Sequence, residues 1–244
     1  SSPYLRLHAK DLVAWQPWQE SSLEVAQQLG KPIFLSIGYL ACHWCHVMQR
    51  ESFADPEIAG QINRRFYPIL VDREELPQVD ALYQSALAVM GLPIGWPLTV
   101  FLTSDRKPIW GGAYFPKKTK FGAPGLDTVL IRILDIYSKR KKDVLADAKQ
   151  VIDELERESE NSPGTISLKH IDKFAANLLT ELDPSDGGFG DAPKFPNVIA
   201  LETLWRTYIR TGLKIYGQAV EKAVQQMVLG GLYDHIGGGF FRYT

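Results

Sequence analysis

The residues with the clearest chemistry are two cysteines and two histidines in one short segment, Cys42-His43-Trp44-Cys45-His46. The chain has only two cysteines, and they stand three positions apart. On a helix this spacing places both sulfurs on the same side, so they can close an intramolecular disulfide. A Cys-x-x-Cys pair in a chain with so few cysteines indicates redox or metal chemistry rather than a secreted disulfide scaffold.

A redox role is favoured by the residues that precede the pair. The apolar run Lys31–Gly38, bounded by proline and glycine, predicts a buried strand, and Cys42 then falls at the start of a helix. The helix dipole and free backbone N–H groups stabilise an anion there, which predicts a lowered pKa for the Cys42 thiol. We expect Cys42 to be the exposed attacking sulfur and Cys45 the resolving one. His43 and His46 are expected to stabilise the thiolate.

Three other interpretations of the pair stay open. Cys42-x-x-Cys45-His46 has the spacing of covalent c-type haem attachment, although nothing in the chain indicates the compartment that such attachment needs. The ligand types would suit a metal ion, but no second cysteine pair is present to complete a structural zinc site. The cysteines could also be buried and inert, which the flanking histidines argue against. We expect the redox role, with no cofactor and no metal.

The pair must be positioned by a domain in which helical and strand patterns alternate from residue 19 to residue 158. The expected helices are Gln19–Leu29, Cys45–Ser52, Pro56–Arg65, Pro77–Met90, Leu126–Tyr137 and Lys142–Glu158, and the expected strands are Lys31–Gly38, Phe66–Asp72, Pro97–Thr103 and Pro108–Ala113. This order predicts an α/β domain with a mixed sheet flanked by helices. Residues 1–18 show no period and are expected to be irregular, laying aromatic side chains over the core.

A second domain is expected to follow. Residues 160–164 have linker composition and predict a boundary between domains 1–160 and 161–244. Beyond the boundary we expect three helices and no strand: Ser167–Leu182, Val198–Thr211 and Tyr216–Leu229, separated by the Gly-rich loops Asp186–Pro196 and Gly230–Gly239. No short internal repeat is visible in the sequence.

Composition excludes some classes of partner. The 244 residues carry a net charge of −1, so nothing indicates nucleic acid or an anionic membrane as a partner. No apolar run approaches the roughly 20 residues that a membrane span needs. No signal peptide is visible, and we expect a cytoplasmic protein.

The order of strand, Cys-x-x-Cys helix, strand, helix and proline-led hairpin resembles the thioredoxin fold. The segment Trp96-Pro97-Leu98-Thr99-Val100-Phe101 resembles the cis-proline segment of that fold, which implies a cis Trp96–Pro97 bond in a loop facing the cysteines. Many thioredoxins carry a buried aspartate six residues before the first cysteine, where it assists proton transfer to the resolving cysteine. Here that position is Ser36, which cannot be a carboxylate base.

The chain resembles one family more closely, the large thioredoxin-like proteins of the spermatogenesis-associated protein 20 family. The motifs that carry the resemblance are Ser2-Pro3-Tyr4-Leu5, Trp15-Gln16-Pro17-Trp18, Lys31–Gly38, Cys42–Met48, Val71-Asp72-Arg73-Glu74-Glu75 and Gly95-Trp96-Pro97. The resemblance implies that residues 161–244 are the start of an (α/α) barrel similar to the six-hairpin glycosidases. The segments Gly187-Gly188-Phe189, Pro193–Pro196 and Gly231–Phe240 resemble the opening of such a barrel.

We therefore expect a thiol–disulfide oxidoreductase whose partners are protein thiols or disulfides. The residues expected to carry the chemistry are Cys42, Cys45, His43, His46 and Pro97, with Trp44 and Trp96 facing the substrate. The alternative is a carbohydrate-processing or carbohydrate-binding protein of the (α/α)-barrel type, in which the thioredoxin-like domain is a redox sensor or scaffold. Asp186, Asp234 and His235, in the Gly-rich loops, are its candidate residues. The charged segment Asp72–Glu75 is expected to be a salt-bridged strand end.

Overall fold

In the computed structural model the chain divides into two units, residues 1–161 and residues 162–244. The structure describes residues 2–120, 122–159, 164–191 and 193–243. Residues 160–163 of the predicted linker, and residue 192 of the predicted loop Asp186–Pro196, lie outside the described residues. Each unit is described by itself below.

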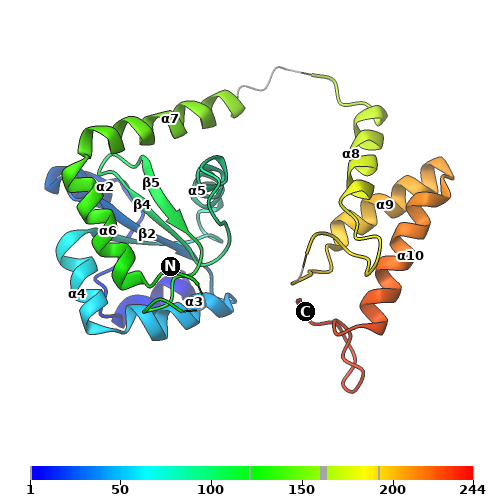
Figure 1. The fold of residues 1–244 in the computed structure, drawn as a ribbon, viewed down its shortest axis with the longest axis horizontal. Helices are drawn as coiled ribbons and strands as arrows, with labels where there is room; N and C mark the ends of the chain where they lie inside the picture. Colours follow the sequence, from blue (N-terminus) through cyan, green and yellow to red (C-terminus); the bar gives the residue numbers. More distant parts are fainter. Residues whose placement is uncertain (1, 121, 160–163, 192, 244) are drawn as a thin grey trace. The chain divides into compact units, whose positions relative to one another are not determined.

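The first unit is built on a five-stranded mixed sheet in the order β1-β3-β2-β4-β5 (Figure 1). Its strands are β1 (Gln16–Pro17), β2 (Ile33–Gly38), β3 (Tyr67–Asp72), β4 (Leu98–Leu102) and β5 (Pro108–Gly112). Strand β3 pairs in parallel with β1 and β2, whereas β4 pairs antiparallel with β2 and β5. The expected mixed sheet of a thioredoxin-like domain is confirmed.

Helices cover both faces of this sheet. They are α1 (Pro3–Leu7), α2 (Glu20–Leu29), α3 (His43–Met48), α4 (Pro56–Arg65), α5 (Pro77–Val89), α6 (Leu126–Lys139) and α7 (Lys141–Ser159). Helix α3 continues into a π-helical turn, Gln49–Phe53. The predicted helix Pro56–Arg65 has the expected N-cap, because the Asp55 carboxylate accepts hydrogen bonds from two backbone N–H groups of its first turn.

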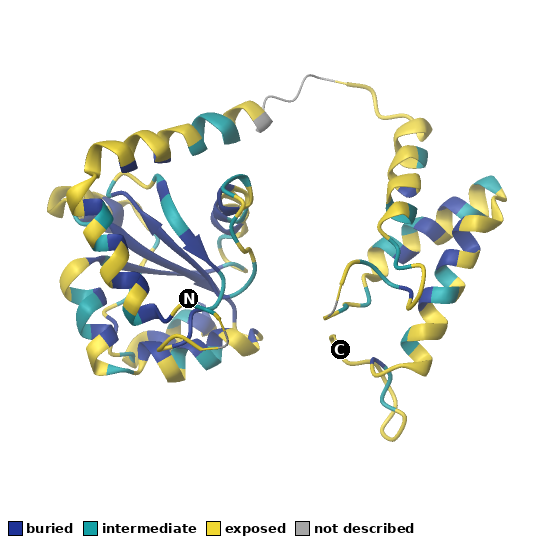
Figure 2. Ribbon diagram, in the orientation of Figure 1, coloured by how far each residue is buried: buried dark blue, intermediate teal, exposed yellow. Residues whose placement is uncertain are grey.

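Successive side chains of β2 point to opposite faces of the sheet, and each face is covered by its own set of helices. Phe34 points into a core formed with α3, α4 and α6, whereas Ile33 and Leu35 point into a core formed with α2, α5 and α7. Both faces of the central strands are therefore buried, as the dark-blue sheet in Figure 2 shows. This burial accounts for the nearly continuous apolar sequence of β2.

The N-terminal segment is more regular than expected. Residues Pro3–Leu7 form α1, whose N-cap Ser2 accepts a hydrogen bond from the Leu5 N–H, and Gln16 pairs with Ile69 in the sheet. A five-residue helix is too short to show a period, and a two-residue strand is recognised only from its partner. The expected aromatic covering is present, since Tyr4 is buried.

The second unit is helical, as expected. Its helices are α8 (Leu168–Thr180), α9 (Val198–Thr211) and α10 (Lys214–Leu229), and the small core between them contains Ala175, Leu204, Tyr216 and Ala219. That this unit opens an (α/α) barrel stays a prediction. Among the helices of the described ranges, none has the length and apolar character to cross a membrane.

Two loops of the second unit share one structure, although no short internal repeat is visible in the sequence. The loops are Leu182–Phe189 and Tyr233–Phe240, and in each the first and last residues form an antiparallel bridge. The aspartate at the second position, Asp183 or Asp234, accepts hydrogen bonds from two following backbone N–H groups. Only four residues, Asp, Gly, Gly and Phe, are identical at matching positions of the two loops. So few identities do not make the repeat visible in the sequence.

Candidate active site

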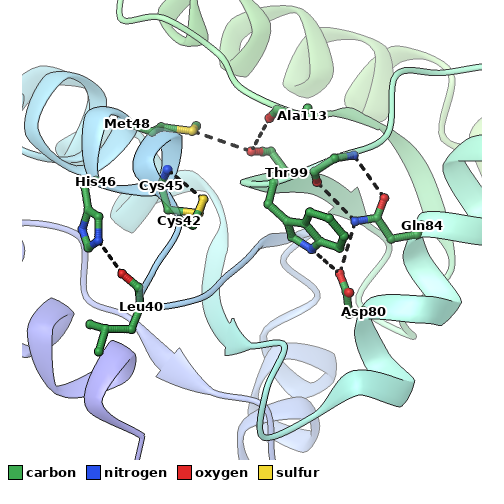
Figure 3. Close-up of a disulfide and its surroundings, with 11 residues drawn as sticks. Leu40, Cys42, Cys45, His46, Met48, Asp80, Gln84, Thr99 and Ala113 are labelled. Carbon is green, nitrogen blue, oxygen red and sulfur yellow. Dashed lines mark hydrogen bonds between the residues drawn. A yellow bond between two sulfur atoms is a disulfide. The ribbon is translucent and has the colours of Figure 1, made fainter. Parts of the chain in front are cut away.

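The two cysteines form a disulfide at the N-terminus of α3 (Figure 3). Cys42 is the N-cap residue, and its sulfur accepts a hydrogen bond from the Cys45 N–H over 3.1 Å. The chain reaches this point directly from β2, through a turn closed by the Cys42 N–H and the Tyr39 carbonyl oxygen at 3.1 Å. The predicted placement of Cys42 at a helix start is confirmed.

The prediction that the Cys42 sulfur is exposed is wrong for this disulfide form. Cys42 is 3% exposed and Cys45 is 2% exposed. The two residues pack in one cluster with the buried side chains of Tyr4, Tyr39 and Leu70. The sequence did not show this cover because Tyr4 lies on α1, far from the cysteines in the sequence. Both cysteines are therefore covered in the disulfide form.

The loop before β4 lies against the cysteine cluster. The Trp96–Pro97 bond is cis, as expected, and the Trp96 ring packs on the cluster that contains both cysteines. Side chains from α5 hold this loop, because Gln84 exchanges two hydrogen bonds with the Gly95 backbone and the Trp96 indole N–H donates to Asp80 over 2.9 Å (Figure 3). Pro97 itself is buried.

The histidines of the motif are placed differently from each other. His46 Nε2 lies 2.6 Å from the Leu40 carbonyl oxygen, so this nitrogen donates to the backbone just before the cysteines (Figure 3). His43 is exposed, and its ring lies edge-on to Trp44, with 5.7 Å between ring centroids. The structure therefore places His46 Nε2 on the backbone rather than on a sulfur.

Trp44 lies on helix α3, between the two cysteines, and is 45% exposed. Its ring packs against Tyr114, with the ring centroids 4.9 Å apart. The Tyr114 hydroxyl in turn donates to Glu51 over 2.8 Å. Trp44 is thus a supported aromatic surface that remains open to solvent.

The charged end of β3 belongs to the same region. Asp72 is 4% exposed and accepts hydrogen bonds from the Ser2 hydroxyl and, at 2.9 Å, from the Glu74 N–H. Arg73 Nε lies 3.2 Å from Asp80, which confirms the expected salt bridge at this strand end. This charged strand end is not wholly exposed to solvent, because the Asp72 side chain is buried.

Arg73 also connects the charged cluster to the aromatic cover. Its guanidinium lies 4.1 Å from the centre of the Trp96 ring and 5.5 Å from that of Tyr39. A cation at this distance is attracted to the face of an aromatic ring. The site therefore includes groups that were not expected there from the sequence: Tyr4, Tyr39, Asp80 and Gln84. Only Tyr4 had a signal in the sequence, its place in an aromatic-rich segment.

The candidate residues for carbohydrate chemistry lie in the second unit. The Asp234 carboxylate accepts hydrogen bonds from the N–H groups of Ile236 and Gly237, which hold its pKa below the ordinary value. His235 lies edge-on to Tyr233 at 5.3 Å. Asp186 is exposed and donates its backbone N–H to Asp183. These contacts stabilise the turns of the two loops.

Among residues 2–120, 122–159, 164–191 and 193–243, no three or more His, Cys, Asp or Glu side chains gather as a metal site requires.

Comparison with known proteins gives several full-length matches to this chain. It is 36% identical over 255 residues to spermatogenesis-associated protein 20 of Rattus norvegicus and 36% identical over 252 residues to that of Homo sapiens, and it covers 32% of each. It is 38% identical over 247 residues to the uncharacterized protein B0495.5 of Caenorhabditis elegans, covering 34% of it. All three matches include 100% of this chain. The chain thus spans about a third of the length of these relatives, and the resemblance stated above is confirmed.

Solved structures offer two further likenesses. The first is titled DsbH Oxidoreductase, with 20% identity, a TM-score of 0.39, and coverage of 50% of this chain and 83% of that one. The second is a thioredoxin from Thermus thermophilus, with 20% identity, a TM-score of 0.36, and coverage of 52% and 88%.

A family model matches residues 1–156, which include the whole sheet, the disulfide and the cis-proline loop. Its description is Thioredox_DsbH, protein of unknown function, DUF255. The match covers well over half of the chain. This chain therefore belongs to the Thioredox_DsbH family, DUF255.

Proposed function

We propose that this protein is a thiol–disulfide oxidoreductase that acts on protein thiols or disulfides through Cys42 and Cys45. One observation carries the proposal: the two cysteines are joined as a disulfide at the N-terminus of α3, with the Cys45 N–H donating to the Cys42 sulfur. When the pair is reduced, the same N–H and the helix dipole favour a thiolate on Cys42. The pKa of the Cys42 thiol is then expected to lie below the ordinary value of about 8.5.

The chemistry follows in two exchange steps. The Cys42 thiolate attacks one sulfur of a substrate disulfide and forms a mixed disulfide, releasing the other substrate sulfur as a thiol. Cys45 then attacks Cys42, which closes the Cys42–Cys45 disulfide and releases the reduced substrate. The same steps in reverse oxidise a substrate dithiol, and the reduction potential of the pair decides which direction prevails.

In this proposal the neighbouring residues shape the approach of the substrate. Trp96 and Pro97 form the loop beside the cysteines, and exposed Trp44 offers a surface to an extended peptide. His43 and His46 are proposed to stabilise the Cys42 thiolate. The cytoplasm is the proposed location.

Equilibration in glutathione redox buffers, followed by alkylation and mass measurement, tests the proposal. We expect a reversible two-electron transition of the Cys42–Cys45 disulfide. Its reduction potential should be about −270 mV if the protein is a reductant, or about −120 mV if it is an oxidant. Because the chain has only two cysteines, the mass shift has one interpretation. Cys45→Ser should trap a mixed disulfide on Cys42, and Cys42→Ser should not trap one. If the wild-type thiols titrate normally and never pair, the protein is not an oxidoreductase of this type.

A further inference from the structure

The buried position of Cys45 creates a requirement for proton transfer. Cys45 is 2% exposed, yet its thiol must lose a proton before its sulfur can attack a mixed disulfide. Ser36 occupies the strand position where a carboxylate would serve, and its hydroxyl is buried with no hydrogen-bond partner among the described residues. A serine hydroxyl cannot hold the proton at neutral pH. Another group must therefore take the proton.

The Tyr4 hydroxyl lies against the same small space as the Cys45 sulfur. A methyl group placed on Gly38 would lie 2.4 Å from the Tyr4 hydroxyl oxygen and 2.8 Å from Cys45 Sγ. Glycine at the end of β2 is thus what lets the phenol approach the sulfur. Tyr4 is 1% exposed, so water does not surround this hydroxyl.

A buried carboxylate stands beside this pair. Asp72 is the register partner of Gly38 on the neighbouring strand β3, and it is 4% exposed. The Ser2 hydroxyl donates to Asp72, and Ser2 is also the N-cap of the helix that carries Tyr4. This bond fixes α1, and with it the phenol, to the end of β3.

Other charged groups also face Tyr4 and the aromatic cover. His8 lies edge-on to Tyr4 at 4.7 Å and pairs with Asp11 at 2.6 Å, and Arg73 lies over the neighbouring aromatic rings. Burial, followed by the charges of Asp72 and Asp11, raises the pKa of Tyr4 well above its ordinary value. The phenol therefore stays protonated at neutral pH and can only relay a proton, which leaves a carboxylate as the acceptor.

We propose that the Tyr4 hydroxyl, with the Asp72 carboxylate beside it, removes the proton from the Cys45 thiol during resolution of the mixed disulfide. This inference rests on the proposed oxidoreductase function. It assigns the task to Tyr4 on α1 and Asp72 at the end of β3 instead of a carboxylate within β2.

The step balances as follows when a protein disulfide is the oxidant. The Cys45 S–H bond breaks, its proton passes to the Tyr4 oxygen, and the Tyr4 O–H proton passes to Asp72. The Cys45 sulfur forms a bond with Cys42 while the bond between Cys42 and the substrate sulfur breaks, and its electron pair leaves on the substrate sulfur. That thiolate takes a proton from water, and Asp72 later returns its proton to water.

The test uses the full chain, reduced and mixed with oxidised glutathione as the probe. Quenched samples analysed by mass spectrometry separate attack by Cys42, seen as mixed disulfide, from resolution by Cys45, seen as its disappearance. Tyr4→Phe and Asp72→Asn should each slow resolution by at least about tenfold near pH 7, so that the mixed disulfide accumulates. Resolution in both variants should then recover as pH rises, because hydroxide replaces the relay.

Tyr83→Phe is the matched control, because it removes another buried tyrosine hydroxyl, one that donates to the Arg106 carbonyl oxygen in the turn between β4 and β5. It should resolve the mixed disulfide at the wild-type rate across the pH range. The inference is overturned if Tyr4→Phe also resolves at that rate, or if it slows attack and resolution equally with an unchanged pH profile. Failure of the wild type to form any mixed disulfide would instead overturn the proposed function.

Discussion

The Trp96 indole N–H donates to the Asp80 carboxylate over 2.9 Å, and Asp80 is only 5% exposed. The same carboxylate lies 3.2 Å from Arg73 Nε and accepts from the Gln84 amide at 3.3 Å. Arg73 in turn packs over the Trp96 ring. One carboxylate on α5 therefore joins the loop that precedes Pro97 to the end of β3.

Asp80→Ala should destabilise the first unit. It removes the acceptor for Trp96 and the anionic partner of Arg73, and Arg73 is partly exposed, so we expect a loss of about 1–3 kcal/mol in the free energy of unfolding. Urea unfolding followed by near-ultraviolet circular dichroism measures it. Asp135→Ala is the control, because the exposed Asp135–Lys139 pair should change stability by less than about 0.5 kcal/mol. Equal losses in both variants would show that Asp80 has no special structural part.

Gly38→Ala should disturb the packing of α1 on the cysteines. The added methyl group would lie 2.4 Å from the Tyr4 oxygen and 2.8 Å from Cys45 Sγ, distances that force a shift. Overpacking of this kind costs about 1–3 kcal/mol, measured as the change in free energy of unfolding of the disulfide form. Gly60→Ala in α4 is the control, since its methyl group meets only the flexible end of Arg64 and alanine favours a helix. A stable Gly38→Ala protein with the wild-type spectrum would contradict this packing.

His46→Gln separates two roles of the histidine. Glutamine keeps a side-chain donor for the Leu40 carbonyl oxygen but removes the ionisable ring. Because the proposal has the His46 ring stabilise the Cys42 thiolate, we expect the pKa of the Cys42 thiol to rise in His46→Gln, measured by the pH dependence of alkylation. His46→Ala should in addition lower stability by about 0.5–1.5 kcal/mol. An unchanged thiol pKa in His46→Gln would limit the side chain to holding the loop.

Trp44→Ala should weaken the use of peptide substrates without changing the cysteines. Trp44 is 45% exposed and supported by Tyr114, so its removal takes away contact area rather than core packing. We expect the KM for a disulfide-containing peptide to rise by about tenfold, a loss of about 1.4 kcal/mol in binding, with the reduction potential of the pair unchanged. Trp205→Ala is matched, because Trp205 is 40% exposed and packs on Tyr208 in the second unit. Both variants giving the wild-type KM would remove Trp44 from the substrate surface.

The loop Leu182–Phe189 should loosen only when the pH falls well below the ordinary pKa of an aspartate. A hydrogen bond from Lys194, and smaller effects of hydrogen bonds from the backbone N–H groups of Asp186 and Ser185, lower the pKa of Asp183 to about 2. A lowered carboxyl pKa means that the stabilisation is complete above the unfolded value of about 3.9 and disappears as pH falls through about 2. The amide proton shifts of Ser185 and Asp186, followed by NMR from pH 6 downward, should show that midpoint. A midpoint near 3.9 would mean that the carboxylate is not held in this way, and Asp183→Asn should abolish the transition.

Several features of the site were predictable because they depend on neighbouring residues. The strand Ile33–Gly38 and the helix that begins after Cys42 follow from an apolar run, a turn and a spacing of three. The proline at position 97 was recognised by resemblance. By contrast, Asp80 and Gln84 occupy ordinary positions of an amphipathic helix, and only their distance from Trp96 and Gly95 shows what they bind.

The exposure of Cys42 was predicted wrongly for the same reason. The N-terminal segment was expected to cover the core, but its sequence does not say which part of the core it covers. Ser2 reaches Asp72 across 70 positions of the chain, and that bond brings α1 over the disulfide. A long-range contact of this kind leaves no period or spacing in the sequence.

The sequence by itself determined the two chemical groups, their spacing, the order of helices and strands, and the family resemblance, because each depends on residues close together in the chain. Tertiary structure alone decided which groups surround the sulfurs. It buried both cysteines under Tyr4 and Tyr39, and it brought Asp72 to Gly38 because parallel strands end at the same edge of the sheet. The environment of the disulfide is thus set by strand pairing and by the packing of α1, which act between residues far apart in the chain.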